Sequence, residues 1–147
     1  MKKIITLLIV IITLLHTSCQ EYSYVENELH GLWQITTVED KTTAEVSNPK
    51  GDLYYSFQRN MVVVSYNSPT KPTGQMMTQY NSDFLLEGDS IHINDFRLYQ
   101  EYGKKAPLQA LKKFGIHGEH TTFHIERPNR KSMILDSEQA RVTLLKY

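Results

Sequence analysis

Hydrophobic and polar residues alternate in short runs over most of the chain beyond residue 28, and clusters of turn-forming residues separate these runs. Such alternation places successive side chains on opposite faces, which is typical of β-strands with one buried face. The pattern predicts strands over residues 31–38, 52–57, 61–66, 75–80, 83–87, 90–94, 121–126, 131–135 and 140–147. Residues 58–60 and 87–89 are expected to form tight turns between neighbouring strands.

Large apolar side chains fall on one face of each expected strand. Trp33, Ile35 and Thr37 share a face of the first strand. The inward residues expected further along the chain are Leu53, Tyr55, Phe57, Val62, Val64, Tyr66, Phe84, Leu86, Ile91, Ile93, Phe123 and Ile125. Small barrels either fill with such side chains or hold one small ligand, and the sequence leaves both possibilities open.

One segment departs from the strand pattern. Pro107 suits a first helical turn, Lys112 and Lys113 suit the negative end of a helix dipole, and Gly115 suits the exit. A short helix is therefore expected over residues 107–114. Its apolar residues Leu108, Leu111 and Phe114 could plug one end of the sheet structure.

Eight or nine short, closely spaced strands predict an all-β fold, either a sandwich or an antiparallel barrel. A closed barrel would remove the exposed strand edges. The chain shows no internal repeat and no second domain. The organisation expected is a signal peptide over 1–18, a tether over 19–28 and one β-barrel domain over 29–147.

The first 19 residues read as an export signal that ends on the only cysteine of the chain. Lys2 and Lys3 precede an apolar run over residues 4–15, which is too short for a membrane span. An ordinary signal peptidase could cut nearby. Alternatively, residues 16–19, His-Thr-Ser-Cys, resemble the lipobox of bacterial lipoproteins, with His16 where an aliphatic residue is usual. That resemblance implies acylation of Cys19 and attachment to the outer membrane, with the side of the membrane left open.

The charge balance argues against a nucleic-acid partner. Without the leader, fourteen lysines and arginines stand against sixteen aspartates and glutamates. The sequence also contains no basic run that could follow a phosphate backbone.

The first expected strand carries Gly31-Leu32-Trp33, which resembles the Gly-x-Trp signature of the lipocalins. The surrounding residues 29–35, and the closing segments 123–126, 131–135 and 140–147, are similar to lipocalin-like lipoprotein domains of Bacteroidota. In that family the tryptophan covers the closed end of the barrel, and a basic side chain from the end of the last strand crosses the indole. Antiparallel pairing of the first and last strands would assign this role to Lys146 rather than Arg141.

Catalytic and metal-binding patterns are weak. His120 and His124 would lie roughly 13 Å apart on one extended strand, too far to share a zinc ion. His92, His117, His120 and His124 are therefore interpreted as surface or loop residues, and no metal or cofactor is expected. No nucleophile motif or glycine-rich phosphate loop is present, which predicts that the protein is not an enzyme.

The resemblance implies a non-enzymatic, lipid-anchored binding module for a small apolar ligand. If the barrel is open, the residues expected to line its mouth are Tyr55, Phe57, Val64 and Tyr66. The alternative is a packed barrel that acts as an interaction or inhibitor protein on an envelope partner. The volume and lining of the interior would distinguish the two.

Overall fold

The computed structural model describes residues 28–67, 77–101 and 103–147. The predicted leader, Cys19 and the start of the strand expected at 75–80 lie outside the described residues. Among the residues described, no helix is long and apolar enough to cross a bilayer.

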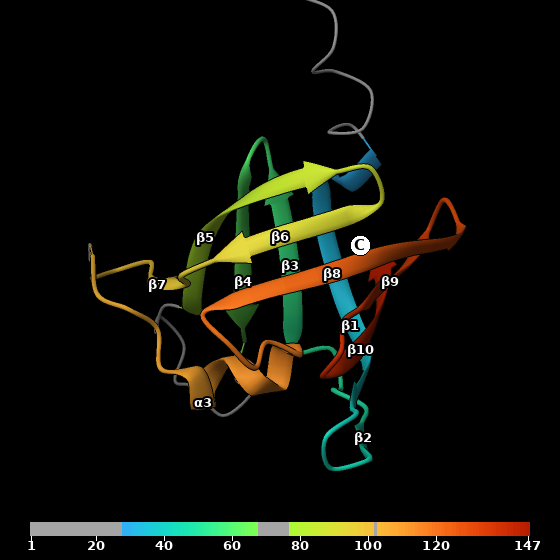
Figure 1. Cartoon of the computed structure of the whole chain (residues 1–147), viewed down its shortest axis with the longest axis horizontal. Helices are drawn as coiled ribbons and strands as arrows, with labels where there is room; N and C mark the ends of the chain where they lie inside the picture. Colours follow the sequence, from blue (N-terminus) through green and yellow to red (C-terminus); the bar gives the residue numbers. More distant parts are fainter. Residues whose placement is uncertain (1–27, 68–76, 102) are drawn as a thin grey trace, which may run out of the picture.

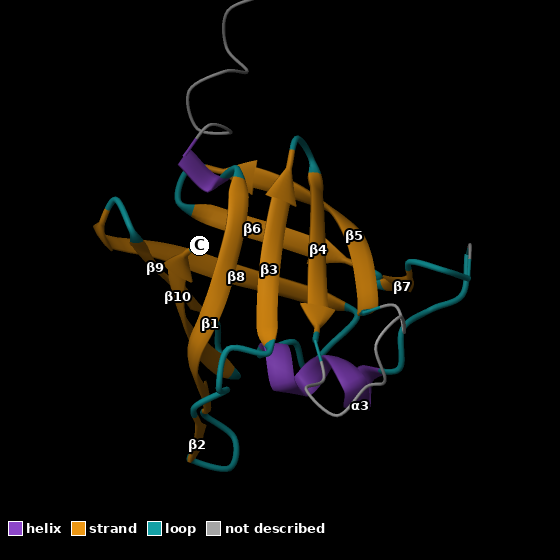
Figure 2. Ribbon diagram, turned by 180° about the vertical axis from the view of Figure 1, so that it is seen from behind, coloured by secondary structure: helices purple, strands orange, loops and turns teal. Residues whose placement is uncertain are grey.

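Eight antiparallel strands of the described chain close into a barrel (Figures 1 and 2). They are β1 Gly31–Asp40, β3 Leu53–Gln58, β4 Met61–Tyr66, β5 Thr78–Glu87, β6 Ser90–Asn94, β8 His120–Asn129, β9 Ser132–Asp136 and β10 Ala140–Lys146. Each strand pairs with the next, and β10 pairs with β1 to close the ring. The expected antiparallel barrel is confirmed, and the sandwich that the alternating pattern also allowed is not formed.

Two short strands lie beside this ring and were not predicted. β2, Glu45–Ser47, pairs with the end of β1, and β7, Arg97–Leu98, pairs with the first half of β5. The structure also corrects the prediction of two strands over 75–80 and 83–87. The polar residues Asn81 and Ser82 do not form a turn there, and one continuous strand, β5, runs through them.

The core lies inside the barrel, as the pattern predicted. Tyr55, Phe57, Val62 and Val64 from the β3–β4 hairpin are fully buried together with Ile91, Ile93 and Phe123. Tyr66, Phe84 and Leu86, which were expected in the core as well, are only partly buried and pack against its edge.

The interior face of β1 changes at a bulge. The register with β10 shifts between Ile35 and Thr37, because β1 has one more residue than its partner at this point. Val38 is therefore buried, whereas Thr37 is only half-buried and its hydroxyl lies 3.2 Å from the side-chain oxygen of Asn48. The expectation that Thr37 would share the inward face with Trp33 and Ile35 is wrong for this reason.

The start of β1 closes one end of the barrel. Gly31 has φ +127°, which side chains rarely tolerate, and its conformation turns the chain into the barrel wall. Trp33 is 3% exposed, and its indole N–H donates to the carbonyl of Leu29 at 2.8 Å. Lys146 Nζ lies 5.2 Å from the Trp33 ring centroid, the contact expected from antiparallel pairing. We call this the tether end, because the described chain begins here at Glu28.

Candidate functional site

The opposite end of the barrel is covered by a short helical segment, which we call the plug. It consists of α3, Leu108–Leu111, continued by a 3-10 turn, Lys112–Phe114. The sequence predicted this element closely. Pro107 precedes it in an extended conformation, and Gly115 ends it with φ +79° in the left-handed region.

The plug inserts apolar side chains between the strands. Leu111 and Phe114 are fully buried, while Leu108 stays partly exposed on the outside. Phe114 packs edge-on against Tyr55, with ring centroids 6.5 Å apart. The Tyr55 hydroxyl donates to the main-chain carbonyl of Phe114 at 2.7 Å. Burial raises the pKa of this phenol well above its ordinary value, so Tyr55 remains a neutral donor.

Of the predicted ligand-lining residues, Tyr55 contacts Phe114 of the plug, whereas Phe57 lies two positions further along β3, opposite Gly31 at the tether end. The rings of Tyr55 and Phe57 stack with centroids 5.8 Å apart, and Phe57 meets Phe84 edge-on at 5.6 Å. Tyr55, Phe57 and Val64 expose at most 1% of their surface, so they line no space that is open to water. Phe114 occupies the space next to the Tyr55 ring.

Tyr66 marks the rim of this end. Its side chain is half-buried, and Lys113 of the plug holds its ammonium 3.7 Å from the ring centroid. A cation over an aromatic face at this distance is an attractive contact. The structure thus brings the four predicted residues together on β3 and β4, and it adds Leu111, Lys113 and Phe114 from the plug.

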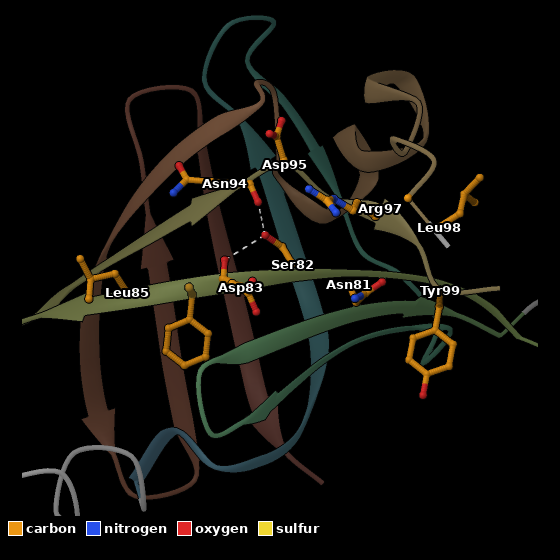
Figure 3. Close-up of a pocket in the computed structure, with 11 residues that line it drawn as sticks. Asn81, Ser82, Asp83, Leu85, Asn94, Asp95, Arg97, Leu98 and Tyr99 are labelled. Atoms are coloured by element: carbon orange, nitrogen blue, oxygen red, sulfur yellow. Dashed lines mark hydrogen bonds between the residues drawn. The ribbon is translucent and has the colours of Figure 1, made fainter. Parts of the chain in front are cut away.

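A groove of about 800 Å³ lies in the barrel wall beside β5 (Figure 3). The first half of β5 pairs with β7 and its second half pairs with β6. Ser82 sits between the strands, and its hydroxyl hydrogen-bonds to the carbonyl groups of Asn94 and Asp83. The lining is mainly polar and includes Asn81, Asp83 and Arg97. Sequence reasoning missed this groove, although its signal was present: Asn81 and Ser82 interrupt the hydrophobic alternation.

The histidines occupy different environments from one another. His120 and His124 are exposed and line a shallow groove on the outer surface, and Nδ1 of His120 lies 2.8 Å from Asn94 Oδ1. His117, by contrast, has a side chain that is only 7% exposed, with Nε2 3.6 Å from Asp40 Oδ2. His117 lies in the loop between the plug and β8, as expected, but its side chain is buried rather than on the surface. Within the described part of the chain, no three metal-binding side chains converge.

A family model described as a lipocalin-like domain matches residues 13–147.

The chain belongs to the lipocalin-like domain family. A lipocalin-like protein from Bacteroides uniformis has a similar structure, with a TM-score of 0.59 and 18% identity over 82% of this chain and 99% of that one. An uncharacterized protein from Bacteroides eggerthii is similar at a TM-score of 0.57 and 19% identity, covering 81% of this chain and 99% of that one. At these identities the two structures show a shared lipocalin-like fold. No curated protein matches the chain.

Proposed function

We propose that this lipocalin-like protein is a non-enzymatic binding module of the cell envelope, held by acylated Cys19, for a small apolar ligand. The observation that carries the proposal is the insertion of Phe114 beside Tyr55. The ligand displaces this ring and takes its place in the barrel.

The plug is suited to displacement because it is short and separate from the ring of strands. It spans seven residues, Leu108–Phe114, and its buried apolar contacts come mainly from Leu111 and Phe114. Elements with few buried contacts open at a lower free energy than the core strands do. With the plug displaced, Tyr55, Phe57 and Val64 supply an apolar wall, and the Tyr55 hydroxyl becomes available to a polar group of the ligand.

A conservative substitution tests this arrangement. Tyr55→Phe keeps the ring but removes the hydrogen bond that holds the plug closed. A neutral hydrogen bond contributes about 0.5–1.5 kcal/mol, so we expect an apolar fluorescent probe to bind roughly 2- to 10-fold more tightly. Titration should show saturation at about one probe per molecule in both proteins.

Tyr54→Phe is the matched control. Tyr54 neighbours Tyr55 on β3 and therefore faces the opposite side of the strand, and its hydroxyl donates to the carbonyl of Gly51 at 2.6 Å rather than to the plug. This variant loses a similar bond and should bind the probe like the wild type. Equal affinity in all three proteins would contradict the plug mechanism.

Anchoring at Cys19 has its own test. Cells fed a labelled fatty acid should incorporate it into the wild-type protein and not into Cys19→Ala. A wild-type protein without label would refute the lipoprotein assignment, whatever the outcome of the probe titration.

A second candidate is an interaction or inhibitor protein with a permanently packed core. It is favoured by the full burial of Tyr55, Phe57 and Val64. In that case neither the wild type nor Tyr55→Phe would take up any probe among fatty acids, bile acids and haem. A protein partner in the envelope would then be sought.

A further inference from the structure

Apolar side chains gather on the outer surface of the tether end, where the first and last strands meet. Leu32 is 38% exposed, Leu145 is 45% exposed and Tyr147 is 80% exposed. The Tyr147 amide donates to the carbonyl of Leu32 at 2.9 Å, which places these residues side by side across the β1–β10 seam. Tyr54 extends the group, because its ring meets Tyr147 edge-on with centroids 5.9 Å apart. We call these four residues the seam patch.

A basic turn lies next to the seam patch. Arg130 and Lys131 are both exposed in the turn between β8 and β9. The Lys131 carbonyl accepts a hydrogen bond from the amide of Lys146 at 2.8 Å, so the turn is fixed beside the end of β10. The neighbouring Arg127 is paired with Glu28, which balances the acidic residue at the start of the described chain.

The chain that precedes Glu28 limits how far this end can move from an anchor at Cys19. Eight residues, 20–27, separate the two positions. Even fully extended, a segment of this length reaches no more than about 30 Å. Leu32 follows Glu28 by only four residues, so the seam patch is held close to any bilayer that contains the acyl chains. Such tethering raises the local concentration of a surface that would bind only weakly by itself.

We propose that the tether end docks on the bilayer, with the seam patch in the interfacial region and Arg130 and Lys131 against anionic headgroups. This inference rests on the proposed acylation of Cys19. Tyrosine and leucine side chains suit the boundary between headgroups and acyl chains, and basic residues are attracted to anionic lipid surfaces. The plug lies at the other end of the barrel (Figure 1). In the docked orientation it would face away from the membrane.

Trp33 provides a built-in reporter for this contact. It is the only tryptophan of the chain, and it lies next to Leu32 at the tether end. The full acylated protein is reconstituted in vesicles of phosphatidylethanolamine and phosphatidylglycerol that carry brominated acyl chains, and Trp33 emission is recorded. We expect quenching in the wild type, weaker quenching in Leu145→Asp, and weaker quenching in Arg130→Gln/Lys131→Gln. Omission of phosphatidylglycerol should weaken quenching in the wild type.

Val46→Asp is the matched control, because Val46 is 60% exposed on β2 at the far end of β1. It should be quenched like the wild type.

Flotation of the vesicles separates docking from anchoring. A protein that floats with the vesicles but is not quenched is anchored and not docked, which overturns this inference alone. A protein that does not float lacks the anchor, which overturns this inference together with the acylation of Cys19 on which it rests, and leaves the ligand-binding proposal to the probe titration.

Two further outcomes would also overturn the docking surface. Unchanged quenching in Leu145→Asp and in Arg130→Gln/Lys131→Gln would place the contact elsewhere. If Leu145→Asp changed the oligomeric state in detergent but not the quenching, the seam patch would be covered by a second copy of the chain.

Discussion

At the scale of single residues, Gly115 is a position where both the backbone conformation and the neighbouring atoms disfavour any residue with a side chain. Its φ of +79° is unfavourable for residues with a side chain, and a Cβ atom there would lie 2.4 Å from Cγ2 of Val142. Gly115→Ala combines left-handed strain of about 1–2 kcal/mol with overpacking of about 1–3 kcal/mol. We expect the free energy of unfolding in urea to fall by roughly 2–5 kcal/mol.

Gly88 in the β5–β6 turn separates the two contributions to this loss. It has φ +59°, but an added Cβ would have no neighbour within 4 Å. Gly88→Ala should therefore show only the backbone part, about 1–2 kcal/mol. An equal loss of stability in Gly115→Ala and Gly88→Ala would mean that the backbone at the end of the plug shifts to accommodate the added methyl group.

The residues that could be predicted from the sequence are those whose role follows from strand pairing. Lys146 could be placed over Trp33 because antiparallel first and last strands bring their opposite ends together. Thr37 was assigned to the wrong face of the strand, because a β-bulge cannot be recognised from the alternation of hydrophobic and polar residues. The loop position of His117 was predicted, but the burial of its side chain near Asp40 was not, because the two residues are remote in the sequence.

At the scale of elements, one ion-pair network joins four segments near the plug end. Asp136 on β9 lies 2.9 Å from Lys41 Nζ and 3.1 Å from Arg141 Nη1, and Arg141 also holds Glu126 of β8 in a bidentate pair. Burial alone would raise the pKa of Asp136, but the hydrogen bonds and charges of Lys41 and Arg141 outweigh it. The pKa therefore lies below its ordinary value of 3.8.

Because the folded pKa of Asp136 is depressed, its contribution to stability is present above the unfolded pKa. It is lost as the pH falls below 3.8 toward the folded value. Asp136→Asn should lower the free energy of unfolding by roughly 0.5–1 kcal/mol at neutral pH, as for partly exposed pairs. The difference from the wild type should shrink in acid, measured by urea unfolding at several pH values.

Glu119→Gln serves as the comparison for this prediction. Glu119 pairs with Lys105 at 3.1 Å, but both side chains are more than half exposed. Its loss should change stability by less than about 0.5 kcal/mol. An Asp136→Asn difference that stayed constant from neutral to acid pH would show that Asp136 acts through packing rather than through its charge.

Among the elements, the plug and the barrel strands other than β5 could be predicted, because each carries its own local signal; β5 was predicted as two strands, because Asn81 and Ser82 interrupt its alternation. Pro107 and Gly115 marked the two ends of the plug in the sequence, so no information on tertiary contacts was needed to place it. β2 and β7 could not be predicted, because strands of three and two residues are too short to show alternation. Phe114 was expected to plug one end of the sheet structure, but its contacts with Tyr55 are tertiary and could not be predicted from the sequence.

At the scale of the whole molecule, the barrel separates its two ends. The chain enters at the end that carries Trp33 and the seam patch, and the plug covers the opposite end (Figures 1 and 2). If both proposals hold, the bilayer contacts one end while the ligand enters at the other. Anchoring should then leave the plug as free to open as it is in solution.

Hydrogen exchange read by mass spectrometry tests this division. The acylated protein is compared in vesicles and in detergent. We expect slower exchange in vesicles for the segments that carry the docking surface, residues 29–33 and 129–132, because the bilayer covers them. Exchange over residues 107–116 should be the same in both, since local opening of the plug does not involve the docked end. Protection of residues 107–116 in vesicles would instead place the plug end on the membrane, and ligand entry would then have to occur from the lipid phase.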